Sequence, residues 1–478
     1  MIRTREWRQE SNNRYRRLAI VVLVLLSGPI LGLFGSRQLI AVALGGIAAL
    51  LLTVIVLKRP PVGLLGLMML SFLVPITIGT GTGTEVSMSV VGLALVVGAF
   101  LLEVSTGDSQ NVRLTVPSIY LPLSIFIAVT LLSFLAGQLP WYPLDPAPMT
   151  AQLGQLGVLV LLPCLVFIMD RYIVTERWLK RLVWLFLGFG SVYVLLTFFP
   201  SVQAALSFVV VQSPNGPLFW TWMTCLAFGQ AFFNSQLSVL WRVVLVGITA
   251  VSLYMGLVIT PQFASGWLPA LVGLTALLWA ARPRFAAVAT VFMLILGAIF
   301  ASEIVDLLLI NEEYSAVTRV EAGKIVVGMV MERSPLLGFG PANYRFYTIE
   351  NPILGWNVLF NSHNQYIDLL AQTGLLGAAA FLWYSVSTGA LLWRLRGYQR
   401  VSGFLRALSY SLFGGLIGMV AAGMLADWLL PFVYNITLAG MRDAVPGWMF
   451  LGAALSLHRV ATMHDSSRSD EQPLPRPA

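Results

Sequence analysis

One stretch of the chain, residues 314–377, combines basic side chains with a histidine in a sequence that is otherwise poor in charge. The residues that could do chemistry there are Arg319, Lys324, Arg333, Arg345 and His363. Arginine and lysine bind phosphate and other anions, and a neutral imidazole accepts a proton from a hydroxyl group. The stretch therefore indicates a site for an anionic substrate with a general base beside it.

The composition indicates what holds this stretch in place. Hydrophobic residues make up 58% of the 478 residues, charged residues only 10%, and the mean hydropathy is +0.82. Ordinary soluble domains are far more polar, and one membrane-spanning helix needs roughly 20 apolar residues. Long uncharged runs of that kind favour helices over a β-barrel. We therefore expect an all-α polytopic membrane protein with about 12–14 transmembrane helices and short in-plane helices in one long outer loop.

The apolar runs and the loops between them divide the chain into five segments. These are a cytoplasmic basic N-terminus at 1–17, a transmembrane bundle at 18–303, a long outer catalytic loop at 304–363, C-terminal transmembrane helices at 364–460 and a disordered cytoplasmic tail at 461–478. The expected spans are 18–35, 39–57, 62–79, 87–104, 118–137, 151–169, 182–200, 217–233, 243–260, 264–281, 285–303, 364–392, 407–426 and a last one that ends near His458.

The basic residues indicate which way the chain crosses the membrane. With this division only six of the 29 Lys and Arg fall in outer loops, and four of the six lie in the one long loop. Positive residues gather on the cytoplasmic side of membrane proteins, so both termini are predicted to be cytoplasmic. The net charge of +8 thus follows membrane topology, and we expect no nucleic-acid partner.

Two capping patterns place the chemical groups on helices. Thr318 and Glu321 have the spacing of a capping box, which predicts an in-plane helix from Thr318 to Arg333. Arg319 would then lie in the first helical turn, where it and the free N–H groups of that turn would bind one anion. A lipid-linked pyrophosphate is such an anion.

The second pattern, Ser362 to Gln365, puts His363 at the first position of the span at 364–392. A helix N-terminus keeps a histidine neutral, as a general base requires. A polar stripe follows at intervals of four residues, formed by Asn364, Asp368 and Gln372. Polar groups at such depth face a bundle interior or a wet cavity.

At this point the sequence resembles the O-antigen ligase and O-antigen polymerase superfamily. The ligase-type signature is a His followed by Asn, Ser or Gln, nine residues, and Gly-x-x-Gly. Here His363 and Asn364 are followed by nine residues and then by Gly374 to Gly377. The family's in-plane helix begins with an Arg and ends in Pro-Leu-x-Gly-x-Gly-Pro, which Arg319 and Pro335–Pro341 match.

The resemblance implies a metal-independent, inverting glycosyltransferase without a cofactor, in the bacterial cytoplasmic membrane with its active loop on the outer face. Its partners would be a glycan donor on undecaprenyl pyrophosphate, a glycan or lipid acceptor, and the bilayer. Carried over, Arg319 would neutralise the leaving group and His363 would assist the acceptor hydroxyl. The further candidates, for substrate binding, are Arg345, Lys324, Asn364, Gly340, Tyr344 and Asp368.

One position departs from the family pattern. Family members often carry Ser-Arg-Gly at the outer start of a span ahead of the long loop, whereas residues 263–267 read Phe-Ala-Ser-Gly-Trp. A second phosphate ligand would then come from Arg345, Lys324 or Arg333. We favour Arg345, because it lies between Arg319 and His363 in the chain.

Three other functions stay open. An O-antigen-type polymerase would join repeat units on lipid carriers, whereas a ligase moves a finished glycan to another acceptor. A flippase or exporter of lipid-linked glycan would need ionisable groups at mid-membrane depth, and the expected spans have almost none. A degenerate family member without activity would serve as a scaffold.

Overall fold

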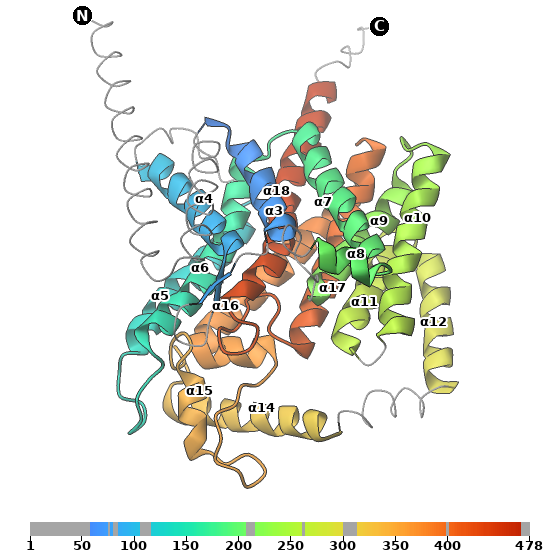
Figure 1. The fold of residues 1–478 in the computed structure, drawn as a ribbon. Helices are drawn as coiled ribbons and strands as arrows, with labels where there is room; N and C mark the ends of the chain where they lie inside the picture. Colours follow the sequence, from blue (N-terminus) through green and yellow to red (C-terminus); the bar gives the residue numbers. More distant parts are fainter. Residues whose placement is uncertain are drawn as a thin grey trace, which may run out of the picture.

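The computed structural model describes residues 58–74, 77–79, 85–105, 116–206, 216–260, 263–299, 313–397 and 401–469. The expected spans at 18–35 and 39–57 lie outside these ranges. The described chain is an all-α bundle with one two-stranded hairpin (Figure 1). Eight of its helices are long and apolar enough to cross a membrane. This agrees with the expected all-α polytopic membrane protein.

The part of the bundle before residue 240 consists of apolar helices. They are α3 (Pro60–Leu73), α4 (Met88–Ser105), α5 (Pro117–Ala136), α6 (Met149–Tyr172), α7 (Glu176–Leu196), the short α8 (Pro200–Ala205) and α9 (Pro217–Phe233). Proline stands at the first position of α3, α5 and α9, where its missing N–H costs no hydrogen bond.

The expected span at 62–79 is wrong after Leu73. Helix α3 ends at Leu73 because Val74, which precedes a proline, takes an extended backbone with φ −119° and ψ 98°. Strand β1 (Thr77–Gly79) then pairs antiparallel with β2 (Glu85–Ser87). The Gly- and Thr-rich segment between α3 and α4 therefore includes a small β-hairpin.

The second part carries the outer loop. It contains α10 (Val239–Tyr254), extended by one π-helical turn (Met255–Ile259), then α11 (Ala264–Ala281), α12 (Pro283–Ile299), α14 (Glu313–Arg333), α15 (Tyr344–Tyr347), α16 (Gln365–Leu395), α17 (Gly403–Leu425) and α18 (Met441–Ser469). Two 3₁₀ turns, Thr348–Glu350 and Leu438–Gly440, complete it. Helix α18 includes Arg442 in its first turn and continues to Ser469, so the tail predicted to be disordered from residue 461 is helical over its first part.

Helix α18 runs through the middle of the bundle and contacts α3, α4, α6, α7, α9, α16 and α17. Buried rings fill the space around it, with Phe450 centred 5.0 Å from both Trp222 and Phe186. Elsewhere small residues let helices approach closely. A Cβ on Gly273 of α11 would lie 2.7 Å from the carbonyl oxygen of Gly414 of α17.

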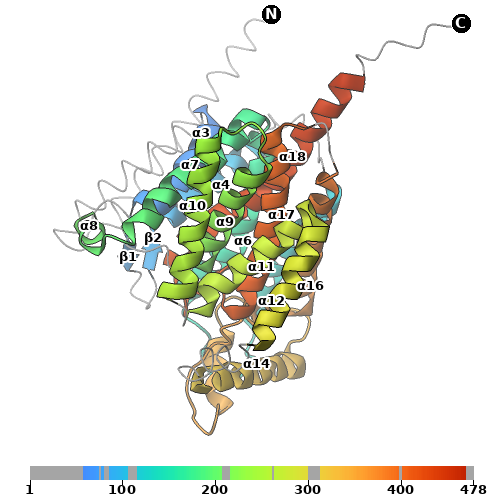
Figure 2. The same cartoon turned by 90° about the vertical axis from the view of Figure 1, so that its right-hand side faces the viewer.

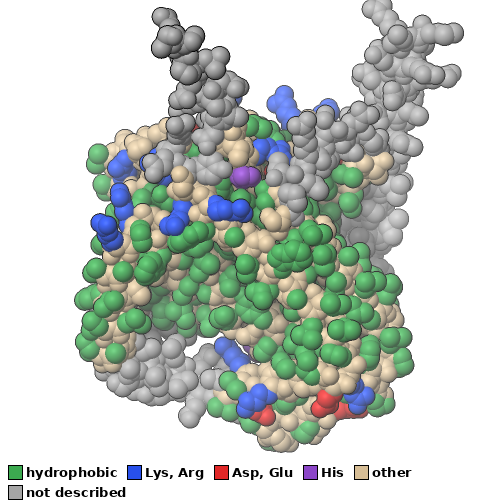
Figure 3. Space-filling view, turned by 180° about the vertical axis from the view of Figure 1, so that it is seen from behind, with side chains coloured by type: hydrophobic (Ala, Val, Ile, Leu, Met, Phe, Trp, Pro, Cys, Tyr) green, Lys and Arg blue, Asp and Glu red, His purple; other side chains and the backbone are tan. Residues whose placement is uncertain are grey.

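Two opposite ends of the bundle differ in what they carry. Helix α14 runs across one end, and the C-terminal part of α18 leaves from the other (Figures 1 and 2). We refer to them as the α14 end and the α18 end. Hydrophobic side chains cover the face between them, and Lys and Arg lie toward the two ends (Figure 3). This is the distribution expected of a chain that crosses a bilayer.

Candidate functional site

A cavity of about 1050 Å³ lies at the α14 end. The segments that line it are the start of α11, the middle of α14, the turn before α16 and the end of α17. Its lining residues are Phe263, Ala264, Ser265, Arg319, Val320, Gly323, Lys324, Val327, Gly328, Ser362, His363, Asn364, Ile367, Met424 and Leu425. Seen from behind, the surface is hollowed above the lower layer of the molecule, and a basic side chain is visible in the hollow (Figure 3).

Helix α14 brings two cations to the cavity. Arg319 and Lys324 both line it, and the Nζ of Lys324 is 3.5 Å from the Oε2 of Glu321 in an exposed pair. The predicted start of this helix is wrong: the chain is already helical from Glu313, so Thr318 lies inside α14 and is not its N-cap. No helix breaker lies between Glu313 and Thr318. Arg319 therefore presents its charge without the first-turn N–H groups.

The turn before α16 carries the histidine, but not as predicted. Asn364 is the N-cap, and its side-chain oxygen accepts hydrogen bonds from the backbone N–H groups of Tyr366 (3.0 Å) and Ile367 (3.3 Å). His363 therefore precedes the helix, with a left-handed backbone at φ +49°. Ser362 does not cap α16: its hydroxyl oxygen accepts from the N–H of Asn364 at 3.1 Å, ahead of the helix, and its hydroxyl donates to the Oδ1 of Asp368 at 2.7 Å.

The glycine motifs position this turn by contact between two backbones. Helix α16 is broken at Gly374, whose φ of +64° and ψ of −168° are non-helical, so the predicted span at 364–392 is not continuous. The turn after α14 enters the break: Phe339 N–H donates to the Ala371 carbonyl (2.8 Å), and Leu375 N–H donates to the Pro335 carbonyl (2.8 Å). We call this contact of 335–339 with 371–376 the glycine lock.

Two glycines make the glycine lock possible. A Cβ on Gly374 would lie 2.2 Å from the Leu336 carbonyl oxygen, and one on Gly338, which has φ +65°, would lie 2.6 Å from the Ala371 carbonyl oxygen. Only glycine combines positive φ with such close approach. The Gly-x-Gly-Pro and Gly-x-x-Gly motifs thus form one structural unit, which fixes the short helix 365–373 and the His363 turn at its start.

The predicted polar stripe is buried against the outer loop and only its first member lines the cavity. Asp368 is 1% exposed and accepts hydrogen bonds from the hydroxyls of Ser362 and Tyr344. Gln372 is fully buried, and its side-chain oxygen accepts from the N–H of Ala342 at 3.3 Å. Burial, followed by the charge and the hydrogen bond of Asp368, raises the pKa of Tyr344 well above its usual value. Tyr344 therefore remains a hydrogen-bond donor.

Four predicted substrate contacts lie outside the cavity. Tyr344 and Asp368 are buried, and Gly340, with φ +82°, packs on α5, where a Cβ would lie 2.8 Å from the Ser133 carbonyl oxygen. The guanidinium of Arg345, which we favoured as second phosphate ligand, stacks on the ring of Tyr434 at 4.9 Å. Lys324 is thus the second predicted cation that lines the cavity.

Arg333 is also directed elsewhere. Its guanidinium lies 4.2 Å from the ring of Tyr142, and its Nη1 donates to the Trp141 carbonyl at 2.9 Å. This arginine ties the end of α14 to the loop after α5. It serves below as a control for the cavity cations.

Charge distinguishes the cavity from an ordinary metal site. No Asp or Glu is among the described residues that line it. Over the described ranges no group of three or more His, Cys, Asp or Glu side chains is arranged to hold a metal ion. The two cations, the imidazole and the amide that line it are groups that can bind an anion.

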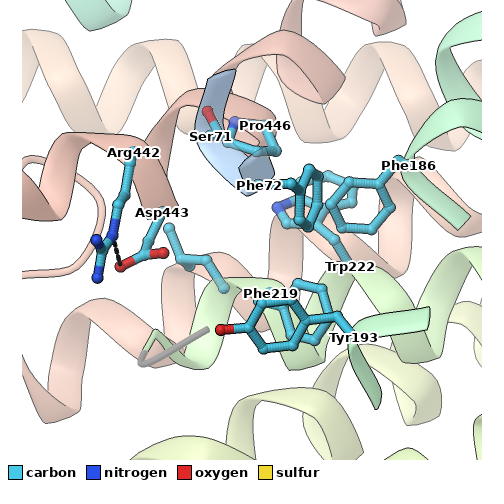
Figure 4. A pocket seen from close by; sticks show the side chains of 10 residues that line it. Ser71, Phe72, Phe186, Tyr193, Phe219, Trp222, Arg442, Asp443 and Pro446 are labelled. Atoms are coloured by element: carbon cyan, nitrogen blue, oxygen red, sulfur yellow. Dashed lines mark ion pairs between the residues drawn. The ribbon is translucent and has the colours of Figure 1, made fainter. Parts of the chain in front are cut away.

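A second cavity is too small for a substrate. It measures about 20 Å³, which is room for about one water molecule. On one side of it lie Arg442 and Asp443, with the Nε of Arg442 3.9 Å from the Oδ2 of Asp443. On the other side lie aromatic side chains, those of Phe72, Phe186, Phe219, Trp222 and Tyr193 (Figure 4). We read it as a packing gap next to an ion pair.

Sequence reasoning missed the apolar part of the large cavity. Met424 and Leu425 of α17 line it together with Phe263, Val327 and Ile367. Nothing in the sequence singles out Met424 or Leu425, because apolar residues at a helix end are common in such a chain. Ser265, at the place where the family pattern has an arginine, lines the same cavity.

The comparisons with known proteins give one finding. No curated protein matches the chain. Residues 247–382 match a family model described as O-antigen ligase, and this segment includes Ser265, Arg319, Lys324, His363 and Asn364. Residues 247–382, a little over a quarter of the chain, are therefore similar to the O-antigen ligase family.

Proposed function

We propose that this membrane protein is a glycosyltransferase of O-antigen ligase type. It transfers a glycan from undecaprenyl pyrophosphate to the hydroxyl group of an acceptor, on the outer face of the bacterial cytoplasmic membrane. The match of residues 247–382 to the O-antigen ligase family supports glycosyl transfer in general. The carrier, the acceptor class, the membrane side and independence from metal ions are our proposals.

The observation that carries the proposal is the shared cavity. Arg319 and Lys324 come from α14, and His363 and Asn364 come from the turn before α16. Two separate segments thus place two cations and an imidazole in one cavity. A pyrophosphate ester carries the negative charge that such cations bind, and the reacting hydroxyl would lie beside the imidazole.

The reaction can be written from these groups. The acceptor oxygen forms a bond to the anomeric carbon of the donor, while the bond from that carbon to the pyrophosphate oxygen breaks and its electron pair leaves with the phosphate. His363 accepts the proton of the acceptor hydroxyl. Arg319 and Lys324 stabilise the negative charge that develops on the leaving group. Holding donor and acceptor together supplies a further part of the rate.

The apolar wall of the cavity suits a lipid carrier. Phe263, Met424 and Leu425 line it, and Phe263 is 58% exposed. A polyprenyl chain is apolar, so it would lie against these side chains while its pyrophosphate contacts Arg319 and Lys324. The pairing of an apolar wall with two cations fits an amphipathic, lipid-linked donor better than a free sugar nucleotide.

The choice between ligase and polymerase rests on the acceptor. The His363-Asn364 signature with its Gly-x-x-Gly favours the ligase. In a polymerase the acceptor would be a second lipid-linked glycan, which a single lipid-facing cavity would have to admit beside the donor.

The test uses purified protein in nanodiscs with an undecaprenyl-pyrophosphate-linked oligosaccharide. We expect transfer to a separate acceptor, unchanged in EDTA. A ladder of products from the donor alone would identify a polymerase, and loss of transfer in EDTA would contradict metal independence. Absence of transfer, with the donor crossing the membrane of protein-containing vesicles, would replace the proposal by a transporter.

A further inference from the structure

The turn that carries His363 rests on buried polar side chains that do not line the cavity. We infer that Asp368 is a positioning residue that, through Ser362 and Tyr344, holds the imidazole of His363 at the cavity. The inference rests on the proposed function for the role of His363. It changes the assignment of Asp368 and Tyr344, for which the sequence predicted contact with the substrate.

The backbone of His363 needs such support. Its φ of +49° lies in the left-handed region, which side chains with a Cβ disfavour. A residue stays in that conformation only when its surroundings fix it. The two neighbours of His363, Ser362 and Asn364, are held by hydrogen bonds to their surroundings.

Hydrogen bonds hold the residue before His363 and the residue after it. The backbone N–H of Asn364 donates to the Oγ of Ser362 at 3.1 Å, and its side-chain amide donates to the Met424 carbonyl at 3.1 Å. The backbone N–H of Ser362 donates to the Oη of Tyr344 at 3.4 Å. Two hydroxyl oxygens, those of Ser362 and Tyr344, thus accept the N–H groups that flank His363.

Asp368 orients the O–H bonds of these two hydroxyl groups. Asp368 is buried, and its Oδ1 accepts hydrogen bonds from the hydroxyls of both Ser362 and Tyr344. With their protons directed to Asp368, the two hydroxyl oxygens expose lone pairs to the backbone N–H groups. The Oγ of Ser362 also lies 3.0 Å from the Asn364 carbonyl oxygen. Its single proton goes to the Oδ1 of Asp368, because that contact, at 2.7 Å, is the shorter of the two.

Asparagine at position 368 keeps the shape and removes this control. The hydroxyls of Ser362 and Tyr344 share the Oδ1 of Asp368, so an asparagine amide that turns its N–H₂ group toward them reverses both hydrogen bonds. The reversed hydroxyls would no longer accept their backbone N–H groups. His363 would then sample other conformations, while Arg319 and Lys324 on α14 would still bind the donor.

The kinetic test compares the wild type with Asp368→Asn and Tyr344→Phe. For each variant we expect kcat to fall about 30-fold while KM for the undecaprenyl-pyrophosphate-linked donor stays within about twofold. In a His363→Ala background Asp368→Asn should change the rate less than about twofold, because the group it positions is gone. A raised KM with an unchanged kcat, an unchanged rate, or additive losses would overturn the inference.

The matched control is Tyr120→Phe. Tyr120 is also a buried tyrosine that donates to a buried carboxylate, that of Asp170, but it lies at the α18 end. This variant loses the same kind of hydrogen bond without contacting the cavity, so we expect the kcat of the folded protein to remain unchanged. A fall like that of Tyr344→Phe would show that any loss of such a bond impairs the protein, and would overturn a specific role for Asp368.

A second readout does not depend on catalysis. The chain has three histidines, so the NMR signal of a labelled His363 ring is identified by its absence in His363→Ala. We expect this signal to shift or split in Asp368→Asn and Tyr344→Phe and to stay in place in Tyr120→Phe. An unmoved signal in both variants would overturn the positioning role. If the wild type transfers no glycan, the proposed function fails, while this measurement still decides whether Asp368 orients the ring.

Discussion

The two ends of the bundle use their charged side chains differently. At the α18 end, acids and bases pair between helices: Asp170 of α6 accepts from Arg459 of α18 at 2.8 Å, and Glu103 of α4 accepts from Arg171 at 2.9 Å. At the α14 end, Arg319, Lys324 and His363 line a cavity where no acidic residue lies among the described lining residues. Charge thus holds helices together at one end and faces a binding volume at the other.

The ends also differ in what fixes their geometry. The α18 end relies on side chains, since Tyr120 and Arg459 both donate to Asp170. The α14 end relies on backbone contact, because the glycine lock joins 335–339 to the break in α16. The backbone contact holds the segment without using the side chains of Arg319 and Lys324 that line the cavity. This difference can be tested at both ends.

The largest effect is expected from the glycine lock. Gly374→Ala places a Cβ 2.2 Å from the Leu336 carbonyl oxygen. The backbone conformation of Gly374 is also one that glycine adopts readily and alanine does not. We expect a loss of stability of at least about 3 kcal/mol and little folded protein. Thermal unfolding in detergent measures it.

The control for this variant is Gly266→Ala. Gly266 is inside α11 with nothing within 4 Å of an added Cβ, so alanine there should be neutral or stabilise by about 0.5–1 kcal/mol. Equal stability of the two variants would show that the contact of Gly374 with the turn after α14 does not hold the α14 end.

The next effect concerns the ion pair at the α18 end. Arg459→Met leaves the Asp170 carboxylate, which is 2% exposed, without its cation. Removing one member of a buried pair costs about 3 kcal/mol. We expect the unfolding temperature to fall while glycan transfer per folded molecule stays within about twofold. A selective loss of transfer would show that the α18 end takes part in the reaction.

A smaller effect separates the cations of one helix. Lys324→Ala should weaken the binding of undecaprenyl pyrophosphate in nanodiscs about tenfold, the loss of one charge-assisted contact. Arg333→Ala on the same helix should leave the affinity unchanged, because Arg333 stacks on Tyr142 outside the cavity. If Arg333→Ala weakened binding and Lys324→Ala did not, the second phosphate contact would belong to Arg333.

The smallest effect tests the position at which the family pattern has an arginine. Ser265 lines the cavity, so Ser265→Arg adds a third cation there. We expect about threefold tighter binding of undecaprenyl pyrophosphate, since a partly exposed charge contributes less than a buried one. Weaker binding would mean that the side chain occupies the space of the substrate.

Much of the architecture could be predicted from the sequence because apolar runs act locally. The α14 helix ends at Arg333 as predicted, and Arg319, Lys324, His363 and Asn364 line one cavity. Local patterns were wrong where a distant contact decides. Ser362 fits a capping box, yet its hydroxyl bonds to Asp368 and Asn364 caps the helix instead.

Of the remaining errors, one is local and two come from distant contacts. Thr318 fits a capping box, but the residues before it also form helix, so the pattern marks no boundary. Gly374 lies in an apolar run that predicts a continuous span, and the break is set by the turn at 335–339. Arg345 is close to His363 in sequence, but its guanidinium stacks on Tyr434 of a later loop.

The central claim is that Arg319 and His363 act on one lipid-linked substrate in the cavity at the α14 end. The most direct test is glycan transfer from an undecaprenyl-pyrophosphate oligosaccharide by purified wild type, Arg319→Ala and His363→Ala, each shown to be folded. We predict that each variant loses at least about 100-fold in rate. Rates within a few-fold of wild type in both variants would contradict the assignment of the cavity as the active site.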